Sequence, residues 1–187
     1  KATNRTVVTF VGEPAAVVEA AYRAIKKASE VIDMSRQTGE HPRIGATDVC
    51  PLVPIANISM EETAEWARRL GAMVGDPLSI PIFLYEAAAT RPERRNLATI
   101  RSGEYEGLPE KLKKADWQPD FGPAIFNAKA GATVIGARDF LVAYNINLNT
   151  TSTRRANAIA FDVREAGRNI TENGIKINKP GTLKTVK

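Results

Sequence analysis

The sequence predicts an α+β fold, because runs of β-branched residues alternate with amphipathic helical stretches along most of the chain. The order is strand, helix, strand, then helix and strand, which is the order of a ferredoxin-like split βαβ sandwich. A further strand and helix near the carboxyl end indicate the start of a second, incomplete unit of this kind. A composition of 43% hydrophobic and 25% charged residues is typical of a globular protein.

The strands are predicted from runs of β-branched and apolar residues that end at glycine or proline. The first run, RTVVTFV, is closed by Gly12. Pro51 and Pro54 lie in the second run and indicate an edge strand or a bulge. The predicted strands are Arg5–Val11, Ala46–Ile55, Ile80–Tyr85, Ala132–Ile135, Phe140–Leu148 and a short TLKTV segment near the end of the chain.

The helices are predicted from apolar residues at three- and four-residue steps and from capping signals. Pro14 suits the first turn of one helix, and Ser59 with Glu62 forms the pattern of a capping box at the start of another. The stretch between Glu86 and Gly131 is less regular, which is typical of functional segments. The predicted helices are one that opens near Pro14 and stops before the loop of residues 37–43, one from Ser59 to about Val74, short pieces near Glu93–Arg101 and Pro109–Lys114, and Thr153–Gly167.

Composition excludes several classes of protein. Cys50 is the only cysteine, so no intrachain disulfide can form, and a cytoplasmic location is expected. A single histidine and a single cysteine disfavour a zinc site, so no metal is predicted. No apolar run approaches the roughly 20 residues of a membrane helix, and the first residues do not have the pattern of a signal peptide. No membrane association is therefore predicted.

The net charge of +5 comes from the carboxyl end, where residues 153–187 carry eight Lys or Arg and three acidic residues. One interpretation is a solvated basic surface. The other is a surface that attracts an anionic ligand, either a polyglutamate tail or a nucleic acid. Binding of nucleic acid would need aromatic residues among the basic ones, and Phe161 is the only aromatic residue there. We therefore expect no nucleic-acid partner.

His41 lies in the polar sequence GEHPRIG between a predicted helix and a predicted strand. A lone histidine is more often structural, but two glycines and a proline fix the backbone here, and such loops commonly carry catalytic residues. A neutral imidazole is suited to general base catalysis. The lack of a positioned nucleophile disfavours a hydrolase triad. The pattern favours a transfer reaction in which the substrate supplies the nucleophile.

Trp117 and Phe126 bracket a stretch rich in proline and glycine, WQPDFGPAIF. Aromatic rings in such a stretch could line a slot for a flat heterocycle, with Lys129 adding positive charge. The alternative is a loop that these two rings anchor to the core. Cys50 lies in an apolar run and is interpreted as an inert core residue.

Several segments together resemble the formiminotransferase family, whose members include the amino-terminal half of formiminotransferase-cyclodeaminase and free-standing bacterial enzymes. The matching segments keep the same order along most of the chain. They are TNRTV (3–7), IDMSR (32–36), GEHPR (39–43), GEYE (103–106), PDFGP (119–123), GAT (131–133) and AYNINL (143–148).

The resemblance implies two related ferredoxin-like subdomains with a folate-binding cleft between them, in a homodimer. Residues 1–137 would be the amino-terminal subdomain without its first strand and helix, and residues 138–187 the start of the carboxyl-terminal subdomain. Members of the family begin earlier and continue further than this chain. We expect the chain by itself to associate through strand edges or to be marginally stable, and to show no transfer.

The resemblance also implies the reaction, which moves a formimino group between N-formimino-L-glutamate and N5 of tetrahydrofolate in histidine degradation. Tetrahydrofolate is a co-substrate, and His41 is the catalytic base. Arg43 and Arg5 are candidates for the substrate carboxylates, with ordinary surface ion pairs as the alternative. The family's folate-binding segment falls on Gly122, Pro123, Ala124, Ile125, Phe126, Asn127, Ala128, Lys129, Ala130 and Gly131.

Within that segment Ala130 stands where vertebrate members of the family have tryptophan. Two alternatives to the transferase remain open. One is a folate-binding piece without catalysis, and the other is a related one-carbon folate conversion on the same scaffold.

Overall fold

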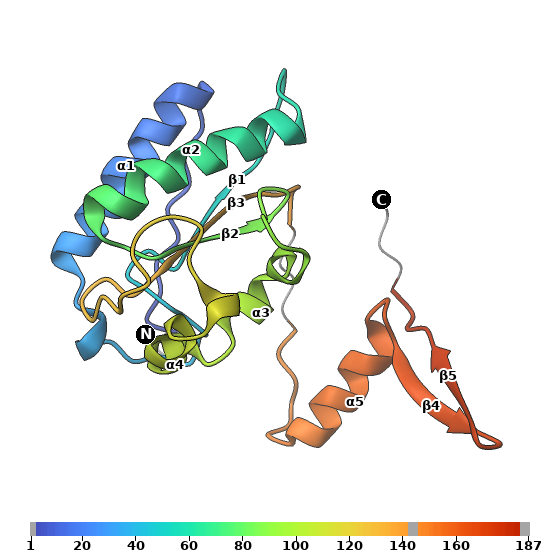
Figure 1. Ribbon diagram of the computed structural model, residues 1–187. Helices are drawn as coiled ribbons and strands as arrows, with labels where there is room; N and C mark the ends of the chain where they lie inside the picture. Colours follow the sequence, from blue (N-terminus) through green and yellow to red (C-terminus); the bar gives the residue numbers. More distant parts are fainter. Residues whose placement is uncertain (1–2, 142–145, 184–187) are drawn as a thin grey trace. The chain divides into compact units, whose positions relative to one another are not determined.

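A computed structural model describes residues 3–141 and 146–183 of the chain. The chain divides into two compact units, Lys1–Leu141 and Val142–Lys187. The first unit holds a three-stranded sheet between layers of helices, and the described part of the second holds a helix and a two-stranded hairpin (Figure 1). No helix within the described residues is long and apolar enough to cross a membrane.

The first unit has helices between its strands. Its elements are α1 (Pro14–Val31), the 3-10 turn η1 (Met34–Arg36), β1 (Val49–Leu52), α2 (Met60–Leu78), β2 (Ile82–Glu86), η2 (Pro92–Arg95), α3 (Leu97–Arg101), α4 (Glu104–Leu112), η3 (Ala115–Trp117) and β3 (Thr133–Ala137). The sheet order is β1-β3-β2, and β3 runs parallel to both neighbours. The two strands joined by α2 are therefore separated by a third, which is a split β-α-β arrangement.

The predicted mixture of helices and strands is confirmed, and β1, β2 and β3 each overlap a predicted strand. Every pair in this sheet is parallel, because helical crossovers join β1 to β2 and β2 to β3. The hairpin-joined strands of a ferredoxin-like unit would instead be antiparallel. The sheet of the first unit contains no such antiparallel pair within the described residues. The ferredoxin-like topology is therefore not confirmed and stays a prediction.

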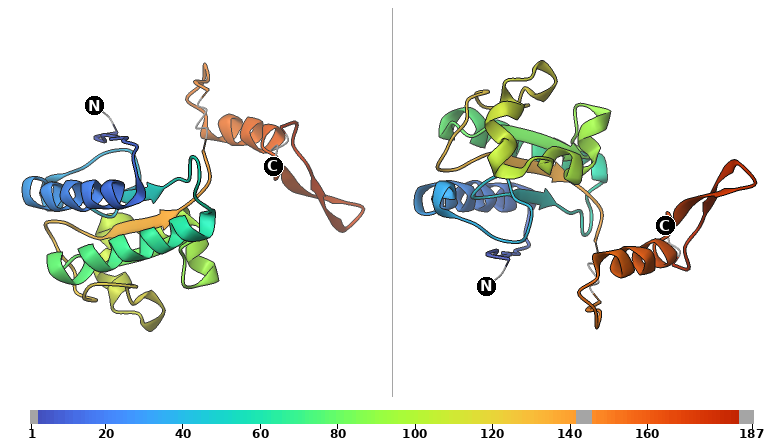
Figure 2. Two further views of the ribbon diagram at one scale, coloured as in Figure 1. Left: turned by 90° about the horizontal axis from the view of Figure 1, so that it is seen from above. Right: turned by 90° about the horizontal axis from the view of Figure 1, so that it is seen from below.

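The two faces of the sheet are buried against different helices, as Figures 1 and 2 show. Ile82 and Leu84 belong to one apolar cluster, with residues of α1 and α2. Phe83 and Tyr85, which alternate with them, belong to a second cluster, with residues of α3 and α4. The alternation is the two-residue period of a β-strand. Burial on both faces explains why β2 is a nearly continuous apolar run.

The start of each long helix is as predicted. Pro14 occupies the first turn of α1. At α2 the hydroxyl of Ser59 accepts a hydrogen bond from the backbone N–H of Glu62, and the Glu62 carboxylate accepts one from the backbone N–H of Ser59. The capping box is therefore confirmed. The helix continues beyond its predicted end at Val74, to Leu78.

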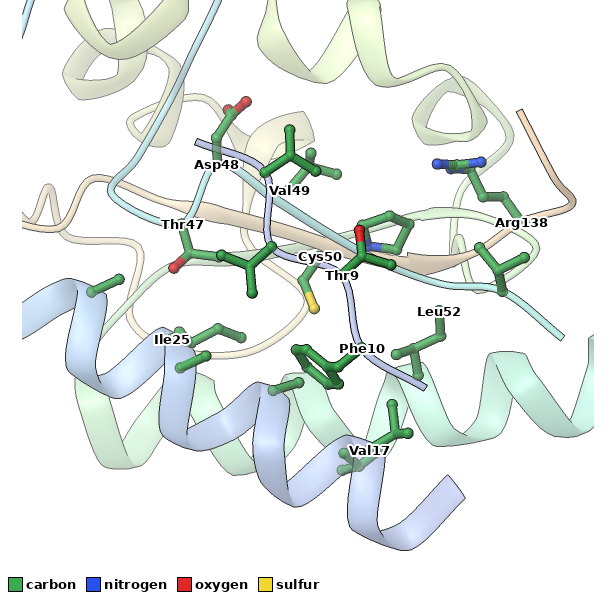
Figure 3. A pocket seen from close by; sticks show the side chains of 18 of the residues that line it. Thr9, Phe10, Val17, Ile25, Thr47, Asp48, Val49, Cys50, Leu52 and Arg138 are labelled. Atoms are coloured by element: carbon green, nitrogen blue, oxygen red, sulfur yellow. The ribbon is translucent and has the colours of Figure 1, made fainter. Parts of the chain in front are cut away.

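The prediction of a strand at Arg5–Val11 is wrong, because this extended segment pairs with no strand in the described structure. Its side chains are largely in solvent, with Val7 and Val8 each 74% exposed. A strand needs a hydrogen-bonded neighbour, and a groove separates this segment from the open edge of β1 (Figure 3). The edge position that Pro51 predicts for β1 is confirmed.

The described part of the second unit contains α5 (Thr153–Val163), β4 (Arg168–Glu172) and β5 (Ile175–Lys179). The predicted helix is confirmed, although it ends before Gly167. The antiparallel hairpin of β4 and β5 was not predicted. Its turn is Asn173-Gly174, with φ angles of 51° and 79°. This is the backbone that a two-residue hairpin favours, and Asn-Gly is its commonest sequence.

Two other predicted strands are not found where the chain is described. In Phe140–Leu148, residues 140–141 and 146–148 are not in a strand, and residues 142–145 lie outside the described residues. In TLKTV, Thr182 and Leu183 donate backbone hydrogen bonds to the carbonyls of Asp162 and Val163, at 2.9 and 2.8 Å. Their backbone N–H groups therefore bind the end of α5 rather than a strand, and residues 184–186 lie outside the description.

Candidate active site

The loop that carries His41 also contains Gly45 and Ala46, whose backbones contact the predicted folate-binding segment. The backbone N–H of Ala46 donates to the carbonyl of Ala130 at 2.8 Å, and Gly45 and Gly131 form an antiparallel bridge. A Cβ atom at Gly45 would lie 2.7 Å from the carbonyl oxygen of Ala130, and Gly131 has a φ of 68°. Both positions therefore need glycine. These contacts place the two predicted segments side by side at the amino ends of β1 and β3.

Tyr105, from the GEYE segment, connects these two loops. Its backbone N–H donates to the carbonyl of Arg43 at 2.8 Å. Its hydroxyl donates to the carbonyl of Ala128 at 2.6 Å, and its ring lies against Phe126 with the centroids 5.3 Å apart. The GEHPR loop, the GEYE segment and the predicted folate-binding segment, which are distant in the sequence, are therefore in contact.

Arg43 forms ion pairs with two carboxylates at the amino end of α4. Its Nη1 donates to Glu104 and to Glu106, at 3.0 Å each, and its Nη2 donates to the second oxygen of Glu106 at 2.5 Å. The hydrogen bonds from Arg43 hold the pKa of Glu106 below its ordinary value. The Arg43 side chain is only 17% exposed. Its predicted contact with a substrate carboxylate stays a prediction, and it would require these glutamates to move.

The ring nitrogens of His41 both have partners. Nδ1 lies 2.8 Å from the carbonyl oxygen of Pro42, and Nε2 lies 2.5 Å from Nη1 of Arg5. A carbonyl can only accept and a guanidinium can only donate, so these contacts fit the tautomer that has its proton on Nδ1 and its lone pair on Nε2. This is the neutral form that a general base requires.

Asn4 fixes the position of Arg5 on the His41 loop. Its side-chain amide donates to Oε1 of Gln37 and to the carbonyl of Thr38, both at 2.9 Å. Asn4 has a positive φ of 45°, a conformation that asparagine tolerates better than most residues. The TNRTV segment is thus held in place by hydrogen bonds rather than by a strand ladder.

The turn η1, from the IDMSR segment, also contacts the predicted folate-binding segment. The backbone N–H of Met34 donates to the carbonyl of Lys129 at 2.9 Å, and Nζ of Lys129 donates to the carbonyl of Glu30 at 2.7 Å. Asp33 caps the turn, and the hydrogen bond from the Ser35 hydroxyl lowers its pKa. The end of α1 is therefore joined to this segment.

The predicted folate-binding residues differ in exposure. Ala130 is only 4% exposed and packs in the cluster under α1 and α2, so its side chain is turned away from solvent. Phe126 and Trp117 pack at the edge of the second cluster, as expected if they anchor the loop. The exposed members are Ala124, Ile125, Ala128 and Lys129, the partly buried ones are Gly122, Pro123, Phe126 and Asn127, and the buried ones are Ala130 and Gly131.

The ion pair of Arg94 and Asp120, which was not predicted, holds the start of this segment. Their side chains are 1% and 7% exposed, and Nη1 of Arg94 lies 2.8 Å from Oδ2 of Asp120. The same oxygen accepts from the backbone N–H of Leu84 at 2.8 Å, and Nη2 of Arg94 donates to the carbonyl of Gln118 at 2.6 Å. The guanidinium also lies over the ring of Trp117. The aspartate of PDFGP is therefore a buried anchor.

A groove of about 1690 Å³ runs between the 5–11 segment, α1 and β1, and both Arg5 and His41 line it. Figure 3 shows Phe10, Val17 and Cys50 on its walls. Burial raises the pKa of the Cys50 thiol to about 11, so the thiol is protonated and unreactive at neutral pH. No group of three His, Cys, Asp or Glu side chains within residues 3–141 and 146–183 could hold a metal ion.

Residues 1–138 match the family model of the formiminotransferase domain, N-terminal subdomain, and residues 143–187 match that of the formiminotransferase domain. The chain therefore belongs to the formiminotransferase family, as its segments predicted.

Particular relatives fall into two kinds. Formimidoyltransferase-cyclodeaminase of Mus musculus is 52% identical over 98% of this chain and 32% of its own length. Glutamate formimidoyltransferase of Streptococcus pyogenes is 50% identical over 88% of this chain and 55% of its own length. Glutamate formimidoyltransferase of Thermoplasma acidophilum is 49% identical over 90% of this chain and 56% of its own length. The chain thus spans about a third of the first relative and about half of the other two.

Proposed function

We propose that this chain is part of a glutamate formimidoyltransferase, which moves a formimino group between N-formimino-L-glutamate and N5 of tetrahydrofolate in histidine degradation. The observation that carries the proposal is the contact between the loop of His41, with its lone pair on Nε2, and residues 122–131. The names of the relatives that share about half of their length with the chain support it.

The proposed reaction begins when N5 of tetrahydrofolate attacks the electron-poor amidine carbon of formiminoglutamate. A new N–C bond forms in a tetrahedral intermediate, and Nε2 of His41 takes the proton that leaves N5. The bond from this carbon to the glutamate nitrogen then breaks, its electron pair stays on that nitrogen, and His41 returns the proton there. Such proton transfer contributes about 10²–10⁴ in rate, and binding both substrates together adds to it.

The proposed folate site uses the solvent-facing part of residues 122–131. The exposed side chains of Ala124 and Ile125 and the partly exposed ring of Phe126 offer an apolar surface to the pterin. Lys129 offers a positive charge, although its ammonium group already donates to the Glu30 carbonyl. Tetrahydrofolate is a co-substrate in this scheme, and no metal takes part in it.

Arg5 is the better placed of the two candidates for the glutamate carboxylates. Arg43 already holds two glutamates, whereas the segment of Arg5 is exposed and its guanidinium contacts the proposed base directly. A planar guanidinium can bind a carboxylate through two parallel hydrogen bonds. We therefore assign the substrate carboxylate to Arg5 first.

The test is release of glutamate from N-formimino-L-glutamate by a polypeptide that spans the full length of the relatives. The proposal predicts that release requires tetrahydrofolate and that N5 acquires the formimino group. Folate binding without release would favour a non-catalytic folate-binding piece. Transfer of a different one-carbon group, with no activity toward formiminoglutamate, would favour the related conversion.

A further inference from the structure

Arg5 differs from Arg43 and Arg101, because its guanidinium contacts an imidazole and not a carboxylate. Arg43 is paired with Glu104 and Glu106, and Arg101 is paired with Asp48. The ion pairs found within residues 3–141 do not include Arg5. Its charge is therefore available to an anionic ligand.

The chain holds Arg5 over His41 through its neighbours. The amide of Asn4 donates to Gln37 and to the Thr38 carbonyl, immediately before the histidine loop. A Cβ atom at Gly39 would lie 2.7 Å from the carbonyl oxygen of Thr3, so glycine permits the close approach of the two backbones. The backbone around Arg5 is fixed, while its long side chain can rotate.

The guanidinium of Arg5 covers Nε2 of His41, the atom that takes the proton in the proposed reaction. Nε2 of His41 carries the lone pair, and Nη1 of Arg5 donates to it at 2.5 Å. The lone pair cannot take a proton from N5 of tetrahydrofolate while it accepts that hydrogen bond. Arg5 must therefore leave Nε2 before His41 can act as a base.

A carboxylate would compete effectively for Arg5. The guanidinium is charged in both cases, but with a carboxylate it also gains the attraction between opposite charges and can make two hydrogen bonds in parallel. The neutral imidazole offers a single lone pair. A carboxylate that enters beside His41 would therefore draw the guanidinium away from Nε2.

We propose that Arg5 is a positioning residue that covers Nε2 of His41 until a carboxylate of the acidic amino-acid substrate takes its guanidinium. The base then becomes free only when that substrate is bound. The inference rests on the proposed function for the identity of the substrate and adds the coupling between substrate binding and exposure of the base.

Nitrogen-15 NMR of the His41 imidazole tests this in the polypeptide that spans the full length of the relatives. His41 is the single histidine of this chain, and its signal is identified by its loss in His41→Ala. The probe ligand is L-glutamate, and sodium chloride at equal ionic strength is the control. In the wild-type chain we expect the proton on Nδ1 and an Nε2 signal that glutamate, but not chloride, moves toward the value of an unbonded nitrogen. In Arg5→Met the signal should have that value from the start and should not respond to glutamate.

Arg23→Met is the matched control, because Arg23 pairs with Glu19 on the surface of α1. In Arg23→Met, glutamate should move the Nε2 signal of His41 as it does in the wild type. The inference is overturned if Arg5→Met leaves the Nε2 signal at the wild-type value, or if glutamate and chloride affect the wild-type ring equally.

A kinetic measurement on the full-length enzyme adds a second readout. We expect Arg5→Met to lower kcat/KM for formiminoglutamate by about 10- to 100-fold, mainly through KM, because a hydrogen bond to a charged group is lost. Arg5→Lys should recover part of this loss. If glutamate moves the Nε2 signal of the wild type but no formimino group is transferred, the proposed reaction is refuted, while the coupling between substrate binding and exposure of the base stands. Transfer without the ring response would refute the coupling alone.

Discussion

Tyr105 makes two contacts with the predicted folate-binding segment that one substitution can separate. In Tyr105→Phe the ring can stay against Phe126, while the hydrogen bond to the Ala128 carbonyl is lost. We expect the free energy of unfolding to fall by about 0.5–1.5 kcal/mol, and folate affinity to fall severalfold because the segment is held less firmly. Urea unfolding and folate titration measure the two effects. Tyr22→Phe on α1 is the control, and an equal loss of folate affinity there would contradict this account.

Glu106 gives a prediction about acid stability. Its pKa is lowered chiefly by the hydrogen bond from Arg43. A carboxylate with a lowered folded pKa contributes stability that is present above its unfolded pKa, about 4.3 for glutamate, and is lost as the pH falls through the folded value. In that range the free energy of unfolding should fall less steeply in Glu106→Gln than in the wild type.

The difference will be small and salt-dependent, because the Glu106 side chain is 63% exposed. Urea unfolding across a series of acidic pH values measures it. Glu110→Gln, whose partner Lys113 is fully on the surface, serves as the control. Identical pH profiles of Glu106→Gln and the wild type would show that the Arg43 pair does not hold the loop.

At the scale of elements, the connection between β2 and β3 depends on one buried ion pair. Asp120→Asn leaves the Arg94 guanidinium, only 1% exposed, without its carboxylate. Loss of one partner of a buried pair costs about 3–5 kcal/mol. We expect Asp116→Asn to change the free energy of unfolding by less than about 0.5 kcal/mol, since Asp116 is exposed and only its backbone carbonyl binds Arg94.

Urea unfolding of both variants tests this expectation. Equal stability of the two would show that the Arg94 pair does not anchor the PDFGP segment. The double variant Arg94→Met, Asp120→Leu should recover only part of the loss. Apolar residues can replace a buried pair, but the backbone N–H of Leu84 and the carbonyl of Gln118 then lose these partners.

Some elements could be predicted because their signals are local. The capping box at Ser59 and the proline at the start of α1 depend on residues only a few positions apart. The β4–β5 hairpin could also have been predicted, since Asn173-Gly174 between alternating isoleucines is a strong turn signal.

Other features depend on partners that are distant in the sequence. The strand pattern of residues 5–11 is genuine, but pairing requires a neighbour that the pattern does not contain. Arg94 lies in the polar sequence PERR and has no local sign of burial, since its partner Asp120 is distant along the chain. The candidate site was predicted through segments that match one family, while the covering of His41 by Arg5 emerged only from the structure.

At the scale of the whole molecule, the positive charge is concentrated in residues 153–187, with eight basic and three acidic residues. If this region attracts a polyglutamate tail, polyglutamylated folate should bind more tightly than the monoglutamate at low salt. That advantage should shrink at physiological salt. Dissociation constants for both ligands at two salt concentrations measure it. Equal weakening of both ligands would identify the region as a solvated surface.

The family assignment covers nearly all of the chain, and the chain spans about half of the free-standing relatives. The site described above contains the proposed base, the arginine proposed to cover it and the residues proposed to bind folate. We therefore expect activity to depend on the regions of the relatives beyond the matched part, and kinetics should be measured in a polypeptide of their full length.

The most direct test of the central claim is the rate of glutamate release by His41→Ala in that full-length polypeptide. If Nε2 of His41 is the base, kcat should fall by about 10²-fold or more, while the dissociation constant for folate changes little. Turnover close to that of the wild type would contradict the account, because another group would then have to carry the proton from N5 to the glutamate nitrogen.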